Sequence, residues 1–241
     1  MEAHYAAAYA ELYRRHWWWR VREEIVLAKI ESMLAGARDV RILDVGCGAG
    51  LLFDALARFG YVEGIESDRS VVEQAGRWQH RIVIGELDAS YTPQAPFDLI
   101  LLLDVLEHVS EPRELLRRAA GVLNPKGRIL VTVPAFDWLW TGHDDMNHHV
   151  KRYTATGMRR LITEAGLVPV ESGYLFQSLV FPKLLVRARE ALASPSAQVP
   201  KIPGQLLNGA LQAWYRTEYA LAGRLPFGSS LMAIAGIPPP A

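Results

Sequence analysis

Cysteine is almost absent from this sequence, which holds one thiol, Cys47, in 241 residues. One cysteine cannot form an internal disulfide, and no group of cysteines and histidines has zinc-finger spacing, which excludes disulfide and zinc scaffolds. Long hydrophobic runs are also missing. No apolar stretch reaches the ~18 residues that a spanning helix needs, and the first residues lack the apolar core of a signal peptide. These absences predict a cytoplasmic protein in a reducing compartment.

The chain also lacks a net charge, because its 26 Lys and Arg balance its 26 Asp and Glu. The balance conceals an asymmetry: residues 1–150 carry 16 basic and 22 acidic side chains, a net −6, and residues 151–241 carry 10 and 4, a net +6. The acidic part argues against a nucleic-acid partner there. The basic and apolar last part suits an anionic substrate or a membrane surface, although ordinary solvated surface charge would give the same counts.

Short apolar strands alternate with helical stretches along most of the chain, which predicts an α/β fold with a doubly wound, seven-stranded, mostly parallel sheet. A helix capped by Thr154 is expected to end near Gly166. We expect a helical cap over residues 1–36, a core over 37–174, a helical insertion over 175–225 and a last strand within 226–241. The seven predicted strands cover residues 40–46, 61–67, 81–87, 97–106, 127–134, 168–176 and 229–237.

A glycine loop follows the first predicted strand in "VRILDVGCGAG". Such a loop, opening a helix, exposes backbone N–H groups to a polar or anionic ligand. Its glycines are Gly46, Gly48 and Gly50, and Leu51 stands where a dinucleotide loop has its third glycine. No G-K-[ST] follows, so a phosphate-cradling P-loop is excluded as well. The spacing thus argues against nicotinamide, flavin and nucleoside triphosphate ligands.

The segment "LDVGCGAG" resembles the first motif of the class I S-adenosylmethionine-dependent methyltransferases, in the branch that includes the ubiquinone-pathway O-methyltransferases. The segments "GIESD", "GEL", "FDLILLLDVLEHV" and "LNPKGRILVTVP" are similar to the later motifs of that family, in the same order. The resemblance implies that the chain is a methyltransferase that binds S-adenosylmethionine, with Asp44 and the glycines around the methionine end of the cofactor. Cys47 is interpreted as a small residue that fits the turn.

Two further acids fit the cofactor that this resemblance implies. Glu66 ends the second strand, 22 residues after Asp44, where a carboxylate can accept hydrogen bonds from both ribose hydroxyls. Glu86 follows the third strand, where the family places an acid near the adenine amino group. The predicted cofactor site is completed by Cys47 within the glycine loop, by the neighbouring Ser67 and Leu87 and by Asp104 after the fourth strand.

Candidate catalytic residues follow the fourth and fifth strands. Glu107 and His108 lie just after the fourth strand, next to the expected position of the transferred methyl group. His143, His148 and His149 follow the fifth strand. A histidine can remove a proton from a hydroxyl acceptor, and a Glu/His set can instead hold a divalent ion that lowers the pKa of the hydroxyl.

The resemblance makes the metal alternative specific. In the ubiquinone-pathway and small-RNA O-methyltransferases, the Glu-His pair and a later histidine are associated with a divalent metal. Here the pair is Glu107 and His108, and the later histidine is His149, or His148 if the loop is shifted by one. Other methyltransferases with a similar "LEHV" segment bind no metal, so a base and a metal both remain open.

The N-terminal "HWWW" segment and the apolar insertion are expected to enclose the substrate cleft. Three consecutive tryptophans point in different directions on a helix, so they need more than one apolar partner. In the insertion, Lys183 and Arg187 lie four residues apart and would be neighbours on a lid helix with a broad apolar face. The alternative is an additional core helix, kinked at Pro182.

The predicted function is methyl transfer to a small-molecule or lipid-like acceptor, most simply at a hydroxyl, with transient membrane-surface contact and a cytoplasmic or membrane-peripheral location. A nucleic-acid methyltransferase is disfavoured because no basic-aromatic strip covers the motif region. A non-catalytic cofactor-binding partner subunit is the third hypothesis.

Overall fold

The computed structural model describes residues 3–192, 200–221 and 225–239. All seven predicted strands are present within these ranges, although β3 is shorter than predicted and β5 begins four residues earlier. The strands are β1 Val40–Val45, β2 Gly60–Glu66, β3 Ile82–Ile84, β4 Phe97–Leu103, β5 Leu123–Pro134, β6 Val168–Leu175 and β7 Ser230–Gly236. The α-helices are α1 Ala3–Arg15, α2 Trp17–Leu34, α3 Phe53–Leu56, α4 Arg69–Val72, α5 Pro112–Gly121, α6 Gly142–Met146, α7 Ala155–Glu164, α8 Val180–Leu192 and α9 Gln205–Leu221, with 3₁₀-helices η1 Gly76–Arg81, η2 Leu106–His108 and η3 Asp137–Leu139.

The strands form one sheet in the order β3-β2-β1-β4-β5-β7-β6. β1 to β5 pair in parallel, and β7 runs antiparallel between β5 and β6. The strand order reverses between β1 and β4, so the loops that follow these two strands diverge and leave a crevice at the carboxyl edge of the sheet. The predicted doubly wound, mostly parallel sheet is therefore confirmed.

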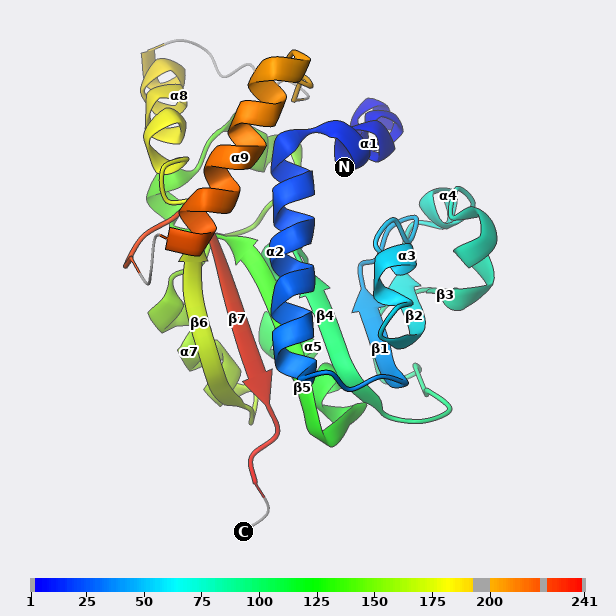
Figure 1. The fold of residues 1–241 in the computed structure, drawn as a ribbon. Helices are drawn as coiled ribbons and strands as arrows, with labels where there is room; N and C mark the ends of the chain where they lie inside the picture. The colour runs from blue at the N-terminus through cyan, green and yellow to red at the C-terminus, as the bar shows by residue number, and fades with distance from the viewer. Residues whose placement is uncertain (1–2, 193–199, 222–224, 240–241) are drawn as a thin grey trace.

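Helices cover both faces of the sheet (Figure 1). One apolar cluster joins α2, α3 and α9 to side chains such as Ile42 and Leu99. The other joins α5 and α7 to side chains such as Ile100 and Val131. Successive residues of the central strands therefore enter different clusters, as expected for strands buried on both faces.

The N-terminal tryptophans find their partners within the chain. Trp17 stacks on Tyr215 of α9, with ring centroids 4.7 Å apart. Trp19 packs edge-on against Tyr9 of α1 at 6.1 Å, and Trp18 lies 5.9 Å from Phe176. The predicted need for several apolar partners is met by α1, α9 and the segment after β6.

The predicted helical insertion appears as α8 and α9, between β6 and β7 in the chain. The first helix is shorter than expected, because residue 175 still belongs to β6 and Phe176 has a positive φ of 56°. Pro182 lies in the first turn of α8, where its missing N–H breaks no helical hydrogen bond, so the expected kink is not needed. The segment between these two helices, "ASPSAQVPKIPG", is rich in Pro and Ser; its residues 193–199 lie outside the described residues, and residues 200–204 have no regular structure.

Within the described ranges, no helix combines the length and the apolar character that crossing a membrane requires.

Candidate functional site

A large cavity of about 1920 Å³ lies at the carboxyl edge of the parallel strands. Its walls include the loop after β1, the ends of β2 and β4, the turn after β3, the α6 region and the inner side of α8. The tryptophans at the start of α2 close another side. Residues 16–19, the loops at the carboxyl edge of the sheet and the inner side of α8, which are distant in sequence, thus line one space.

The glycine loop, Gly46 to Gly50, forms the floor beside β2. Its three glycines have positive φ values of 69°, 56° and 65°. At Gly46 a β-carbon would also approach Cγ2 of Val105 to 2.8 Å. A larger residue would therefore be strained both by the positive φ and by this close contact. Backbone N–H groups of Gly46 and Cys47 donate to the carbonyl of Ile65, which fixes the loop against β2.

Glu66 occupies the wall next to this loop. Its Oε2 accepts a hydrogen bond from the Gly48 N–H at 2.9 Å, and its Oε1 accepts one from the Asp68 N–H at 2.9 Å. Ser67 is exposed and directs its hydroxyl to the same carboxylate at 3.4 Å. The carboxylate is therefore pre-oriented at the cavity surface, with lone pairs left for a ligand.

The remaining predicted cofactor residues also lie at the cavity. Glu86 is exposed and Leu87 is buried, and both line the turn after β3. The Cys47 thiol donates to the Gly48 carbonyl at 3.6 Å, and burial raises its pKa. Cys47 is thus a neutral thiol that packs within the turn, in line with its interpretation as a small turn residue.

Two acids, Asp44 and Asp104, end adjacent strands and face a cation that the sequence did not single out. Arg22 of α2 pairs with Asp104 Oδ2 at 2.7 Å and donates to the Thr132 hydroxyl at 2.9 Å. Burial raises the pKa of Asp44 to about 7, although Arg22 acts in the opposite direction. The helix α2 therefore contributes a charge to the site as well as aromatic packing.

Glu107, His108 and His149 converge at the cavity, and we call these three residues the histidine cluster. One potential ligand atom from each lies within 4.8 Å of the others. The two imidazole rings meet edge-on, with centroids 4.8 Å apart. The Val150 N–H donates to the Glu107 carbonyl at 2.7 Å and joins the two loops. The predicted convergence of the fourth-strand and fifth-strand loops is present in the structure.

Asp144 organises the histidine cluster from behind. Its carboxylate accepts hydrogen bonds from His149 Nδ1 at 2.8 Å and from Arg152 Nε and Nη2 at 2.9 and 2.8 Å. Burial alone would raise the pKa of Asp144, but the hydrogen bonds from His149 and Arg152 outweigh it and hold the pKa well below its usual range. With Nδ1 held in this way, His149 presents Nε2 to the cavity.

Sequence reasoning missed Asp144 and Arg152 as site residues. The signal was present, since both lie in "GHDDMNHHVKR" around the predicted histidines. Nothing in the spacing showed which of the two adjacent acids, Asp144 or Asp145, is buried. The α6 turn decides it: Asp144 closes a capping box with Thr141, whereas Asp145 is exposed and accepts from the Trp140 indole.

The other two loop histidines occupy different positions. His148 is exposed, has a positive φ of 57° and is not part of the cavity wall. His143 lines the cavity beside Lys183 of α8, and burial together with Lys183 lowers its pKa to about 4. The geometry thus brings His149, rather than His148, next to His108.

Burial and the approach of His149 lower the pKa of His108, whereas burial and Asp104 raise that of Glu107. Oε2 of Glu107 is buried and accepts no hydrogen bond from the described residues. One carboxylate oxygen and two imidazole nitrogens are a donor set that suits a divalent transition ion or Zn²⁺, and an orphaned carboxylate oxygen is a free ligand position. The residues present therefore fit a metal ion.

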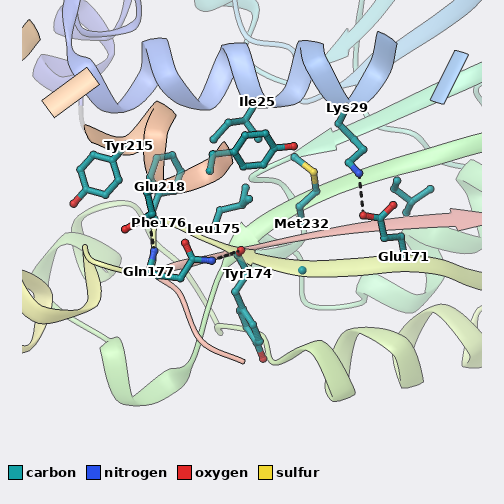
Figure 2. Close-up of a pocket in the computed structure, with 13 residues that line it drawn as sticks. Ile25, Lys29, Glu171, Tyr174, Leu175, Phe176, Gln177, Tyr215, Glu218 and Met232 are labelled. Carbon is teal, nitrogen blue, oxygen red and sulfur yellow. Dashed lines mark hydrogen bonds and ion pairs between the residues drawn. The ribbon is translucent and has the colours of Figure 1, made fainter. Parts of the chain in front are cut away.

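A second, small cavity of about 120 Å³ lies away from this site, between α2, α9 and the strands β6 and β7. Figure 2 shows its apolar side chains, such as Tyr215 and Met232, beneath α2, with the ion pair between Lys29 and Glu171 at one end. It is small and holds no cluster of nucleophilic or metal-binding groups, so it does not compete as the reaction site.

Comparison with known proteins shows which family the chain belongs to. The model of a methyltransferase domain matches residues 14–172, more than half of the chain. The ubiquinone biosynthesis O-methyltransferase of Aeromonas salmonicida is 31% identical over 133 residues, which are 48% of this chain and 56% of that protein. The chain thus aligns with about half the length of the curated relatives that it matches.

Solved structures share the fold across nearly the whole chain. A chain from the complex of the Haloferax volcanii Trm112 methyltransferase activator with a methyltransferase is 18% identical, with a TM-score of 0.59 over 98% of this chain and 95% of its own. Magnesium protoporphyrin IX methyltransferase from Synechocystis, with bound S-adenosylhomocysteine, is 13% identical and has a TM-score of 0.55. The match covers 91% of this chain and 85% of that protein's chain.

The fold and the ordered motifs define a class I S-adenosylmethionine-dependent methyltransferase. Within that class, the chain belongs to the family described by the methyltransferase domain that spans residues 14–172. The resemblance found in the sequence is therefore confirmed, and the site residues can be considered in terms of methyl transfer.

Proposed function

We propose that the protein transfers a methyl group from S-adenosylmethionine to a hydroxyl of a small-molecule or lipid-like acceptor. The observation that carries this proposal is the position of the histidine cluster, in the same cavity as the glycine loop. Oxygen acceptors need a group that removes or displaces a proton, and this cluster supplies one. The similarity to ubiquinone biosynthesis O-methyltransferases supports the same acceptor atom.

In this proposal the glycine loop and Glu66 hold the cofactor. The positive φ values of the loop expose its backbone to the methionine end, with Asp44 and Asp104 beneath it, and Arg22 balances these acids. Glu66 accepts the ribose hydroxyls, Ser67 lies beside it, and Glu86 and Leu87 border the adenine. The cavity, at about 1920 Å³, has room for a cofactor and an acceptor together.

His149 is the residue that we propose to take the acceptor proton. Its Nδ1–H donates to Asp144, so Nε2 is the free acceptor and the buried carboxylate stabilises the imidazolium that forms. His108, whose pKa is lowered by burial and by His149, stays neutral and orients the acceptor. A divalent ion held by Glu107, His108 and His149 would supply Lewis-acid polarisation of the hydroxyl in place of the base.

The test is incubation of the protein with labelled S-adenosylmethionine and fractionated cell extracts, followed by mass spectrometry of the methylated product. His108→Ala and His149→Ala should each lower turnover by about 100-fold or more while leaving cofactor affinity unchanged. His148→Asn is the matched control, because His148 is exposed and asparagine tolerates its positive φ. Near-normal turnover in both alanine variants would leave positioning as the only supported mechanism.

Chelation separates the two versions of this chemistry. If a metal acts, a chelator abolishes turnover and an added divalent ion restores it. If His149 acts as a base alone, the chelator has no effect.

We further propose that the segment over residues 175–225 is a lid that contacts a membrane surface when a lipid-like acceptor enters, so that the protein is cytoplasmic or membrane-peripheral. Phe181 and Leu185 of α8 are 63% and 64% exposed, and Arg187 lies between them and the end of the helix. An apolar helix surface with basic side chains suits an anionic membrane interface. Deleting the segment should leave cofactor binding intact and abolish turnover.

A further inference from the structure

Lys183 stands out because its side chain reaches into the cavity while most of α8 faces outward. Lys183 and Val186 line the cavity, and Glu190 on the same side accepts a hydrogen bond from the Gly142 N–H at 3.1 Å. These positions are three and four residues apart and therefore share one helix face. The inner face of α8 thus delivers one cation to the α6 side of the cavity.

The acids near Lys183 are already occupied. The charged groups that act on the pKa of Lys183 are Arg152, Asp144 and Asp104. Asp144 accepts hydrogen bonds from Arg152, from His149 and from the N–H and hydroxyl of Thr141, which fills the roughly four lone-pair sites of a carboxylate. Asp104 is paired in turn with Arg22 and the Thr132 hydroxyl.

The Lys183 ammonium can donate three hydrogen bonds, and the two carboxylates that act on it, Asp144 and Asp104, are engaged by other donors. Its other neighbour, His143, is neutral near pH 7 because its pKa is lowered to about 4. Burial and Arg152 also lower the pKa of Lys183 itself, to about 8. This side of the cavity therefore carries two cations, Arg152 and Lys183, and its carboxylates, Asp144, Asp104 and Glu190, each already accept hydrogen bonds from other groups of the protein.

We propose that Lys183 is a specificity-determining residue that pairs with an anionic oxygen group on the acceptor, a carboxylate or a phosphate, while the acceptor hydroxyl lies at the histidine cluster. The acceptor class is then a hydroxylated acid rather than a neutral alcohol or phenol. This inference rests on the proposed function, because it places the acceptor in the same cavity. Arg152 cannot take this role, since Asp144 and the Ala135 carbonyl already bind its guanidinium.

The test uses protein saturated with S-adenosylhomocysteine and measures probe affinity by calorimetry. The probes are protocatechuate, an ortho-dihydroxybenzoic acid, its uncharged primary amide and the corresponding aryl phosphonate. The wild-type protein should bind the better of the two acids about 10- to 100-fold more tightly than the amide, the range for a charge-assisted hydrogen bond. Whichever acid binds more tightly identifies the anionic group.

Lys183→Met should abolish the preference for the acid and leave the affinity for the amide unchanged, whereas Lys183→Arg should retain it. Lys126→Met is the matched control, because Lys126 is exposed within β5, away from the cavity, and should change nothing. Equal affinity for acids and amide in the wild type, or an undiminished preference in Lys183→Met, would overturn the inference.

Methyl transfer is measured separately with the same probes. A Lys183-dependent preference without methylation of either probe would sustain the role of Lys183 and count against the proposed hydroxyl acceptor. Methylation of the probes without any preference for the acid would support the proposed hydroxyl acceptor and contradict the role of Lys183. If Lys183→Met lowers kcat equally for acid and amide, the ammonium acts on the reacting oxygen and the assignment to a separate anionic group is wrong.

Discussion

The glycine loop and the histidine cluster lie in one cavity but are held in different ways. The glycine loop is fixed by bonds to the adjacent strand, such as Gly46 N–H to the Ile65 carbonyl, and by Glu66 at the end of that strand. The histidine cluster depends on a buried ion pair, Asp144 with Arg152, and on two loops that are about 40 residues apart. The first is therefore a local structure, and the second exists only in the assembled fold.

Function follows the same division. Phosphate-free cofactors with ribose and amino-acid groups can be bound by backbone N–H groups and one carboxylate, which a local loop can present. Proton transfer needs several side chains in fixed relative positions. The proposed proton-transfer site consequently depends on contacts between more distant segments than the proposed cofactor loop does.

The largest expected effect comes from removing the ion pair behind the histidine cluster. Asp144→Ala leaves the buried Arg152 without its partner, which should lower the free energy of unfolding by about 3–5 kcal/mol. Turnover should be lost as well, because His149 loses the group that orients it. Denaturant unfolding measures the first effect. Asp145→Ala, in the exposed neighbour, should change stability by less than ~1 kcal/mol, and an equal loss in both variants would contradict the role of Asp144.

A smaller effect is expected at the glycine loop. Glu66→Ala removes the proposed ribose acceptor and should weaken S-adenosylhomocysteine binding by about 1.5–3 kcal/mol. Calorimetry measures this loss. Glu73→Ala is the control, because Glu73 is an exposed acid at the end of α4. Unchanged affinity in Glu66→Ala would show that the carboxylate only supports the loop.

An effect of similar size is expected in the pH dependence of stability, at the histidine that caps α2. Burial lowers the pKa of His16 to about 4, while its Nδ1 accepts a hydrogen bond from the Trp18 N–H and caps α2. The unfolded chain, with a histidine pKa near 6.5, binds the proton more strongly, so this contribution is complete above pH ~6.5 and falls as pH decreases toward 4. Between pH 7 and pH 5 the protein should lose ~2 kcal/mol at this histidine.

His16→Asn tests this contribution, since asparagine is a good helix N-cap and does not titrate. The difference in unfolding free energy between pH 7 and pH 5 should be smaller in this variant by that amount. An unchanged difference would mean that other groups, such as the buried His143, account for the whole acid dependence.

Much of the fold could be predicted because its signals are local. Each strand is a short apolar run, and helices follow β1, β2 and β4, so both the seven strands and the parallel arrangement were expected. The start of α8 was placed too early, because the apolar run from residue 175 continues from a strand into a helix without a change in composition. Length and periodicity cannot separate the two there.

The positions of the proposed cofactor-binding residues at one edge of the sheet could also be predicted from the sequence. Asp44, Glu66 and Glu86 lie near strand ends, so the order of the strands fixes their approximate positions. Arg22 was not found, because a charged residue on an N-terminal helix has no sequence signal that relates it to Asp104, about 80 residues away.

The sequence by itself determined the seven strands, the glycine loop and the residue types available for chemistry, because apolar period, glycine spacing and turn residues act over short distances. Only the tertiary structure decided that His149 rather than His148 meets His108, that Asp144 rather than Asp145 supports it, and that Lys183 enters the cavity. Adjacent residues in a loop have nearly the same local preferences. Which of them turns inward depends on contacts with α6, α8 and β4, and those contacts form only when the chain is folded.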